Sequence, residues 1–147
     1  MDYGATVEAQ VGYQMKRVQH TLRLAMDGEL RDLGLTTPQY AALRVLEVEP
    51  GLSGAALARR CFVTPQTMNQ ILANLESAGL VARRRHSEYG RILQAYTTGE
   101  GEGVLSKAHR RVADIERRML AGLDSGERQR LLETLRGCAD ALGSGGT

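Results

Sequence analysis

The residue types best suited to a chemical task lie between positions 64 and 74, in a short segment rich in uncharged hydrogen-bonding side chains. Asn and Gln amides can form paired hydrogen bonds with adenine, and a Thr methyl group can contact thymine, so this set is suited to reading the edges of DNA bases. A face that only meets solvent would more often carry Glu and Lys, and a merely polar surface is the alternative. The candidate DNA-contacting residues are Thr64, Gln66, Thr67, Asn69, Gln70 and Asn74.

A second group of candidates for DNA contact is basic. Arg83, Arg84 and Arg85 are consecutive, and Arg91 follows soon after. Because successive side chains of a strand alternate between faces, Arg83 and Arg85 would share one face and Arg84 would take the other. Guanidinium groups placed in this way can lie along phosphates or enter a minor groove. The alternative for this group is a solvated run of charges.

Two short helices are predicted to position the polar group. The first spans Ser53–Arg60, with the Ser53 hydroxyl as its N-cap, and a three-residue turn follows. The second begins at Thr64-Pro65, a capping hydroxyl followed by a residue whose fixed φ suits the first helical position, and it ends near Gly79. Its apolar stripe has helical spacing. The stripe consists of Met68, Ile71, Leu72 and Leu75.

The arginines are predicted to lie on a β-hairpin, with strands over 81–85 and 91–97 and a turn over 86–90 that contains a glycine. Two helices followed by such a hairpin form a winged helix-turn-helix, so the fold is predicted to be mainly α with a small β-hairpin wing. Between Leu52 and Arg91 there are six Arg and two Glu, a local net charge of +4, whereas the whole chain carries only +2. The basic region therefore coincides with the candidate DNA surface.

Long helices flank this lobe. Apolar residues recur at the helical step from Val7 to Leu33, which predicts one helix approaching about 40 Å in length, ended by Gly34. A second helix is predicted to start at Thr37-Pro38, with Thr37 as the N-cap and Pro38 at the first helical position, and to extend to Pro50-Gly51.

Two further helices are predicted after the hairpin. Thr97 and Glu100 have the spacing of a capping box for a helix that stops near Gly122, and Asp124 and Glu127 have the same spacing at the start of the last helix. The apolar residues of that last helix are expected to be buried. They are Leu131, Leu132, Leu135, Cys138, Ala139 and Leu142.

Apolar stripes at both ends of the chain predict a homodimer, because a second copy related by a twofold axis is the simplest cover for them. Two recognition helices could then enter successive major grooves about 34 Å apart on a pseudo-palindromic operator. The alternative is a monomer that folds its ends together. The expected organisation is an N-terminal dimerisation helix (1–36), a DNA-binding lobe (37–98) and C-terminal dimerisation helices (99–147).

Other classes of protein have little support in the sequence. There is no secretory signal and no apolar run long enough to cross a bilayer, so we expect a cytoplasmic protein without a membrane partner. Cys61 and Cys138 form no disulfide framework, and His20, His86 and His109 are too dispersed to predict a metal site. No nucleophile–base pair, metal set or phosphate-binding glycine motif is present, so no catalytic residue, enzyme activity or cofactor is predicted.

The order of several short motifs resembles the MarR family of bacterial transcriptional regulators over nearly the whole chain. The motifs are Gly34-Leu35-Thr36 with Gln39, Leu57-Ala58, Val63-Thr64, Leu75-Glu76, Gly79-Leu80-Val81 with Arg83, the wing-tip Arg91, and Thr98-x-x-Gly101. Two departures stand out. Tyr89 occupies the position of the aspartate that usually braces the wing-tip arginine, and the first helix lacks the cysteine of the oxidant-sensing branch.

The resemblance implies a homodimeric repressor or activator, and many members release DNA when a small, commonly phenolic or otherwise aromatic, molecule binds. It also implies a ligand crevice lined by the first, second and penultimate helices. The matching effector-binding candidates are Tyr13, Arg17, His20, Tyr40 and Arg44, for which ordinary helix surface or core is the alternative role. A regulator without an effector, controlled by its abundance or by oxidation of Cys61, is the competing hypothesis.

Overall fold

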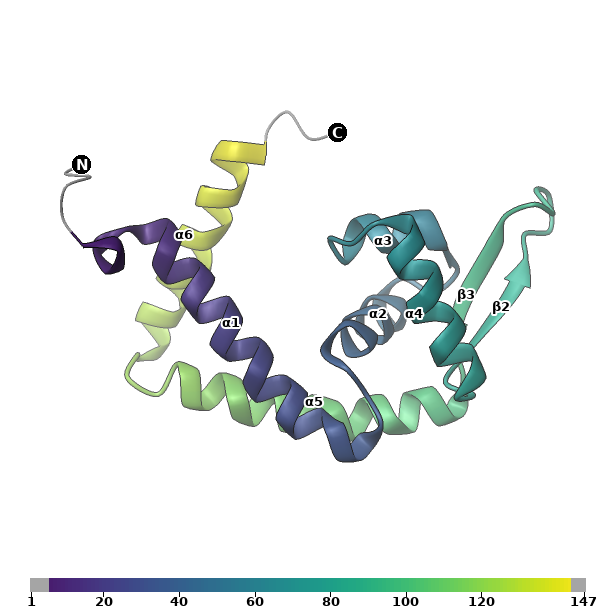
Figure 1. Ribbon diagram of the computed structural model, residues 1–147, viewed down its shortest axis with the longest axis horizontal. Coiled ribbons are helices and arrows are strands. Elements are labelled where there is room, and N and C mark those ends of the chain that lie inside the picture. The colour runs from purple at the N-terminus through teal and green to yellow at the C-terminus, as the bar shows by residue number, and fades with distance from the viewer. Residues whose placement is uncertain (1–5, 144–147) are drawn as a thin grey trace. The chain divides into compact units, whose positions relative to one another are not determined.

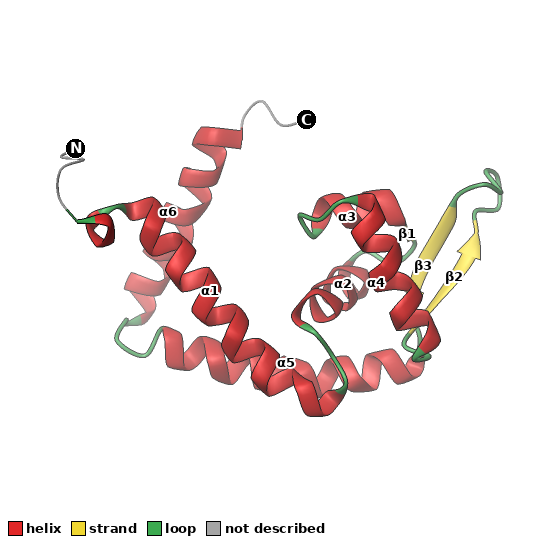
Figure 2. Cartoon of the chain, viewed as in Figure 1, coloured by secondary structure: helices red, strands yellow, loops and turns green. Residues whose placement is uncertain are grey.

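The computed structural model describes residues 6–143 and is mainly helical, with one small antiparallel sheet (Figures 1 and 2). The predicted fold class is confirmed. The chain divides into two compact units, Met1–Val112 and Ala113–Thr147, whose boundary falls within one helix. None of the helices over residues 6–143 combines the length and apolarity needed to span a membrane.

The N-terminal helical region is not continuous. Helix α1 spans Val11–Leu30, and single 3-10 turns precede and follow it at Val7–Ala9 and Arg31–Leu33. The prediction of one unbroken helix was wrong at its N-terminal end, because Gln10 has an extended backbone (φ −81°, ψ 131°) that separates the first turn from α1. Gly34 ends the region as predicted, in the left-handed conformation that glycine adopts readily (φ 72°).

Helix α2 spans Thr37–Val48 and begins one residue before the predicted site. Its N-cap is Thr36, whose hydroxyl accepts from the Gln39 amide while the Gln39 side chain accepts from the Thr36 amide, a complete capping box. Thr37, the predicted cap, instead donates both its amide and its hydroxyl to Asp27 of α1. These bonds to Thr37 lower the pKa of the Asp27 carboxyl and fix the end of α1 to the start of α2.

The segment predicted to form a winged helix-turn-helix has the predicted order of elements with one addition. Helices α3 (Gly54–Arg60) and α4 (Pro65–Ser77) are followed by strands β2 (Val81–Arg85) and β3 (Leu93–Thr97). A two-residue strand, β1 (Leu52–Ser53), was not predicted and pairs with β3, so the sheet order is β1-β3-β2. The wing is therefore anchored to the start of α3 as well as to the end of α4.

The core of the first unit lies where α2, α3 and α4 meet. The predicted caps hold, since the Ser53 hydroxyl accepts from Ala56 and the Thr64 hydroxyl from Thr67. The predicted stripe of α4 is buried along its full length, which orients the helix with its polar side outward. The largest fully buried side chains are Leu30, Leu43, Leu46, Leu57, Met68, Leu72, Leu75 and Leu105.

Helix α5 spans Gly99–Met119, and its N-terminal end is fastened to the end of α4. The cap is Thr98 rather than the predicted Thr97, because Thr97 is still the last residue of β3. The Thr98 hydroxyl accepts from Gly101 and donates to the Gly79 carbonyl at 2.6 Å, and the Thr98 amide donates to the Leu80 carbonyl at 3.0 Å.

The second unit contains the end of α5 and helix α6 (Ser125–Gly143). The predicted capping box is present, with the Asp124 carboxylate accepting from the Glu127 amide at 2.8 Å and the Glu127 carboxylate accepting from Asp124 at 3.2 Å. The expectation that the apolar side of α6 is buried was wrong for a single chain. Leu135 is 44% exposed, Cys138 is exposed, and α6 has no buried residue.

Candidate nucleic-acid interface

Helix α4 presents its predicted polar face to solvent. Because Met68, Leu72 and Leu75 fix the opposite side in the core, the polar residues of α4 cannot be turned inward without exposing that stripe. Every predicted member of the face is exposed. These residues are Thr64, Gln66, Thr67, Asn69, Gln70 and Asn74.

Some of these side chains are already held in place. The Gln70 amide donates to the Asn74 carbonyl oxygen at 3.1 Å, one turn further along the same face. The Thr64 and Thr67 hydroxyls lie 3.0 Å apart at the start of the helix. Gln66 has no hydrogen-bond partner within residues 6–143, so its amide is available to a ligand.

The wing arginines have unequal surroundings. The guanidinium of Arg83 forms an ion pair with Glu76 of α4 at 3.2 Å, and its side chain is only 21% exposed. Arg84 lies over the ring of Tyr96, 5.2 Å from its centroid, a cation–π contact across the hairpin. Arg85 and Arg91 are exposed and have no ion-pair partner in the described part of the chain. Arg83 and Arg84 therefore brace the wing, while Arg85 and Arg91 are free to meet phosphates.

A groove of about 270 Å³ lies between α4 and the wing. Its polar lining combines Asn69 of α4 with Arg83 and Arg91 of the hairpin. The Arg83 Nε atom is buried without a hydrogen-bond partner in the described structure, although its Nη2 atom reaches Glu76. An amide side chain of α4 and guanidinium groups of the wing thus line the same groove.

The turn of the wing is braced by a histidine. The Nδ1 atom of His86 accepts from the amides of Glu88 and Tyr89 at 3.0 and 3.1 Å, and the rings of His86 and Tyr89 lie 5.2 Å apart. The amide of His86 donates to the carbonyl of Ile92 at 2.8 Å, which extends the turn to residue 92 and delays the second strand. The His86 ring thus holds the turn in a wing whose sequence lacks the usual aspartate. Sequence reasoning missed this role because it depends on the conformation of the turn.

The predicted effector-binding residues do not share one cavity. Tyr13 and Arg17 are exposed on α1, and His20 lines a shallow depression of α1 together with Lys16, Gln19 and Arg23. Tyr40 is buried on α2, and Arg44, also on α2, is exposed.

Tyr40 and Arg44 belong instead to one hydrogen-bonded network between α2 and α5. The Tyr40 hydroxyl lies 3.0 Å from His109 Nδ1, and His109 Nε2 lies 2.8 Å from Glu47. Arg44 donates to the same Glu47 oxygen at 3.2 Å. This network joins α2 to the middle of α5 within the first unit, and the sequence could not show it because His109 is 69 residues from Tyr40.

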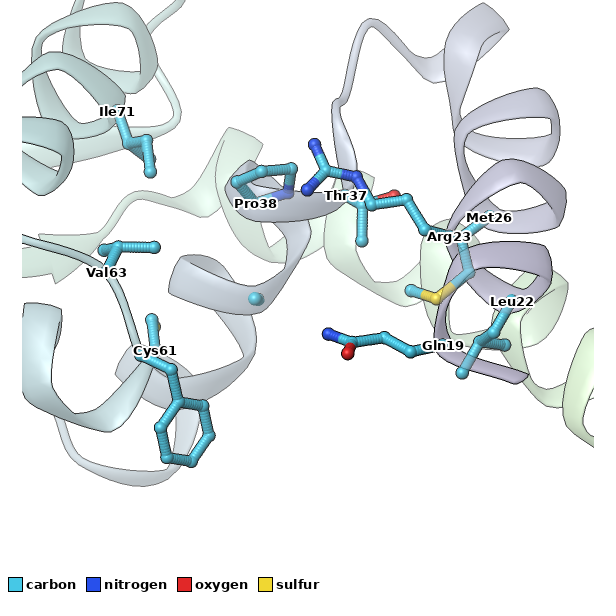
Figure 3. Close-up of a pocket in the computed structure, with 11 residues that line it drawn as sticks. Gln19, Leu22, Arg23, Met26, Thr37, Pro38, Cys61, Val63 and Ile71 are labelled. Carbon is cyan, nitrogen blue, oxygen red and sulfur yellow. The ribbon is translucent and has the colours of Figure 1, made fainter. Parts of the chain in front are cut away.

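A cavity of about 340 Å³ lies between α1, α2 and the turn that joins α3 to α4 (Figure 3). Gln19 and Arg23 extend from α1 on one side, and Cys61, Val63 and Ile71 lie on the other (Figure 3). The walls are largely apolar, and Arg23, held 3.6 Å from Asp27, is the basic group at the cavity. The full lining is Gln19, Leu22, Arg23, Met26, Thr37, Pro38, Ala41, Cys61, Phe62, Val63 and Ile71.

Cys61 lines this cavity but is poorly suited to redox sensing. Burial raises the pKa of its thiol above the ordinary value, and the nearby Arg60 only partly offsets that shift. Because the thiolate is the reactive form, a raised pKa slows oxidation at neutral pH.

An exposed helix with an amide-rich face, an arginine-bearing wing and a core that fixes both define a winged helix-turn-helix protein of the DNA-binding class. A model of the MarR family matches residues 33–92. The chain is 41% identical over 135 residues to the HTH-type transcriptional repressor Rv2887 of Mycobacterium tuberculosis, an alignment that covers 90% of this chain and 97% of the relative. The chain therefore belongs to the MarR family of transcriptional regulators.

Two crystal structures of the Rv2887 protein are similar to this one. The complex with DNA has a TM-score of 0.72 and 36% identity and covers 88% of this chain and 98% of its own. The complex with salicylic acid has a TM-score of 0.71 and 39% identity, with coverages of 88% and 96%.

Proposed function

We propose that this chain is a homodimeric repressor that binds a pseudo-palindromic operator and releases it when a small aromatic carboxylate binds. The observation that carries the DNA-binding part is the exposed amide face of α4 beside the free arginines Arg85 and Arg91. The similarity to a relative solved with DNA supports the same assignment. In this proposal the polar face of α4 reads bases and the wing arginines contact phosphates.

The dimer is supported by apolar surface that each unit leaves uncovered. In the first unit, Val11 is 66% exposed and Met15 and Val18 are also exposed on α1. In the second unit, Leu131, Leu132 and Leu135 are exposed on α6. Such surface costs free energy in water, and a second copy would cover it. We accordingly assign dimerisation to 1–36 and 99–147 and DNA binding to 37–98.

The effector part rests on the cavity in Figure 3. A volume near 340 Å³ is at the small end of the range for ligand sites, which suits a ligand with one ring. The apolar walls would cover the ring, and Arg23 would pair with its carboxylate. A relative solved with salicylic acid supports this class of ligand. The roles predicted for Tyr13, Arg17, His20, Tyr40 and Arg44 stay predictions.

Release of DNA follows from the position of the cavity. Its lining includes Gln19 and Arg23 of α1 and Ile71 of α4, so a bound ligand contacts both the proposed dimerisation helix and the recognition helix. A ligand that binds best at one separation of these elements shifts the population toward that separation. Repression ends if that separation no longer fits two major grooves.

The test is a titration of the purified protein on DNA that flanks its own coding region, followed by addition of salicylate as the probe. The proposal predicts sequence-specific binding by a dimer, measured by sedimentation in the same buffer, and loss of the complex as salicylate is added. Specific binding that salicylate does not weaken would instead favour the regulator without an effector.

A further inference from the structure

Phe62 combines two features that are unusual for an aromatic residue. It lies in the turn between α3 and α4, its side chain is 94% exposed, and its backbone is left-handed (φ 59°). It is the only residue other than glycine with positive φ in residues 6–143. This backbone is the left-handed end of the turn that closes α3, in which the Val63 amide donates to the Ala58 carbonyl at 3.1 Å and the Phe62 amide to the Arg59 carbonyl at 3.4 Å. Glycine takes the same place at Gly34 and Gly79. A residue with a Cβ is less favourable there, and an exposed aromatic ring gains nothing from burial. A polar residue or glycine would serve this turn better if its only task were to connect two helices.

The left-handed turn has a specific geometric result. Cys61 and Val63, on either side of Phe62, are half-buried and pack against the core, whereas Phe62 is directed outward. All three residues line the cavity in Figure 3, where Gln19, Leu22 and Arg23 of α1 also contribute. Phe62 is therefore one of the lining residues of the cavity even though it is exposed.

We propose that Phe62 is the specificity-determining residue of this cavity, and that its ring stacks on the flat face of an aromatic carboxylate whose charge pairs with Arg23. This inference rests on the proposed effector function and adds the residue that selects an aromatic ring over a saturated one. The ring is the only aromatic side chain among the lining residues, whose other apolar members are aliphatic or sulfur-containing. Offset stacking favours flat partners beyond the gain from apolar area alone.

The position of Phe62 also couples selection of the ligand to regulation of DNA binding. Phe62 is two residues before Thr64, the N-cap that starts the recognition helix. A ligand held between this ring and Arg23 of α1 would restrain the first turn of α4 at the point where Thr64 and Gln66 face solvent. Stacking on Phe62 would therefore transmit ligand binding to the recognition helix as well as increase the affinity for the ligand.

The chain contains one Phe and no Trp, which gives a direct measurement on the full-length protein. With ring-labelled phenylalanine, NMR reports Phe62 alone. Salicylate should shift these ring signals upfield through its ring current, whereas 2-hydroxycyclohexanecarboxylate, its saturated counterpart, should not. Calorimetry on the same samples measures binding independently of Phe62. Binding of salicylate by calorimetry with unmoved Phe62 signals overturns the inference and leaves the proposed effector function standing, whereas absence of binding overturns both.

Variants of Phe62 separate the effect of stacking on ligand binding from effects on folding. Phe62→Asn removes the ring but suits the left-handed backbone, so it should fold with an unchanged or higher Tm and bind salicylate about tenfold more weakly. Phe62→Trp keeps a flat ring and should retain the preference for salicylate over its saturated counterpart, whereas Phe62→Leu should lose it. Val48→Trp, at an exposed position at the end of α2 outside the cavity lining, is the matched control for an added indole. An unchanged preference in Phe62→Leu, or a loss of dimer in Phe62→Asn that accounts for the weaker binding, would refute the assignment.

Discussion

Replacement of Gly101 by Ala should destabilise the protein, because α5 starts in contact with the backbone that leaves the recognition helix. A Cβ at Gly101 would lie 2.2 Å from the Leu80 carbonyl oxygen and 2.7 Å from the Thr97 side chain. Since the nearest atom belongs to the backbone, relief requires α5 to move away from the end of α4 by about 1 Å, to reach ordinary van der Waals separation.

The magnitude follows from the bonds that such a movement breaks. The hydroxyl and amide of Thr98 donate to the carbonyls of Gly79 and Leu80, and each of these bonds contributes about 1 kcal/mol. Strain from overpacking adds about 1–3 kcal/mol, and the better helix propensity of Ala returns about 1 kcal/mol. The net loss should be about 2–4 kcal/mol, or a fall in Tm of roughly 5–15 °C for a chain of this size.

The assay is urea unfolding at one fixed protein concentration, because the stability of the proposed dimer would depend on concentration. Gly99→Ala and Gly103→Ala are matched controls in the same helix, since a Cβ at either position meets nothing within 4 Å. Both should be neutral or stabilising by up to about 1 kcal/mol. If Gly101→Ala were as stable as Gly103→Ala, the close fit between α5 and the end of α4 would be refuted.

Three further predictions concern DNA binding and capping. Gln66→Ala should cost about 1–3 kcal/mol on the operator and relax selectivity at one base pair, and equal losses on operator and random DNA, measured by fluorescence anisotropy, would argue against base reading. Arg91→Ala should reduce the slope of log K against log salt by about one, whereas an unaltered slope would show that Arg91 does not contact a phosphate. The hydrogen bond from the Glu127 amide lowers the pKa of the Asp124 carboxyl in the folded protein. The stabilisation that Asp124 contributes is therefore fully present above the ordinary carboxyl pKa, and it is lost as the pH falls through the lowered pKa of the folded state. Asp124→Asn should therefore flatten the fall of Tm in acid, and an unchanged pH profile would contradict this role.

Local signals predicted the parts of the fold that depend on neighbouring residues. Thr64-Pro65 located the start of the recognition helix, and the spacing of Met68 to Leu75 located its buried face. Where two threonines are adjacent, the sequence does not determine which one caps the helix, because either hydroxyl can reach the amides of the first turn. In the structure the caps are Thr36 and Thr98. Thr37 instead donates to Asp27 of α1, and Thr97 is still the last residue of strand β3.

Features that join distant segments could not be predicted in the same way. Strand β1 has two residues and exists only because β3, more than 40 residues later, pairs with it. The cavity that Phe62 lines needs α1 and the turn before α4 to lie opposite each other, and no local pattern encodes that placement. The Leu residues of α6 show the complementary case, in which the apolar pattern was recognised but the residues stay exposed in the described chain.

The most direct test of the account is a DNase footprint of the purified protein on the DNA flanking its own coding region, at physiological salt. We predict protection of two half-sites one helical turn apart, about 10 base pairs centre to centre. In Gln66→Ala this protection should be lost at protein concentrations at which the variant and the original protein bind random DNA equally. Protection without sequence preference, or a single unpaired half-site, would contradict the claim that a dimer reads bases through the polar face of α4.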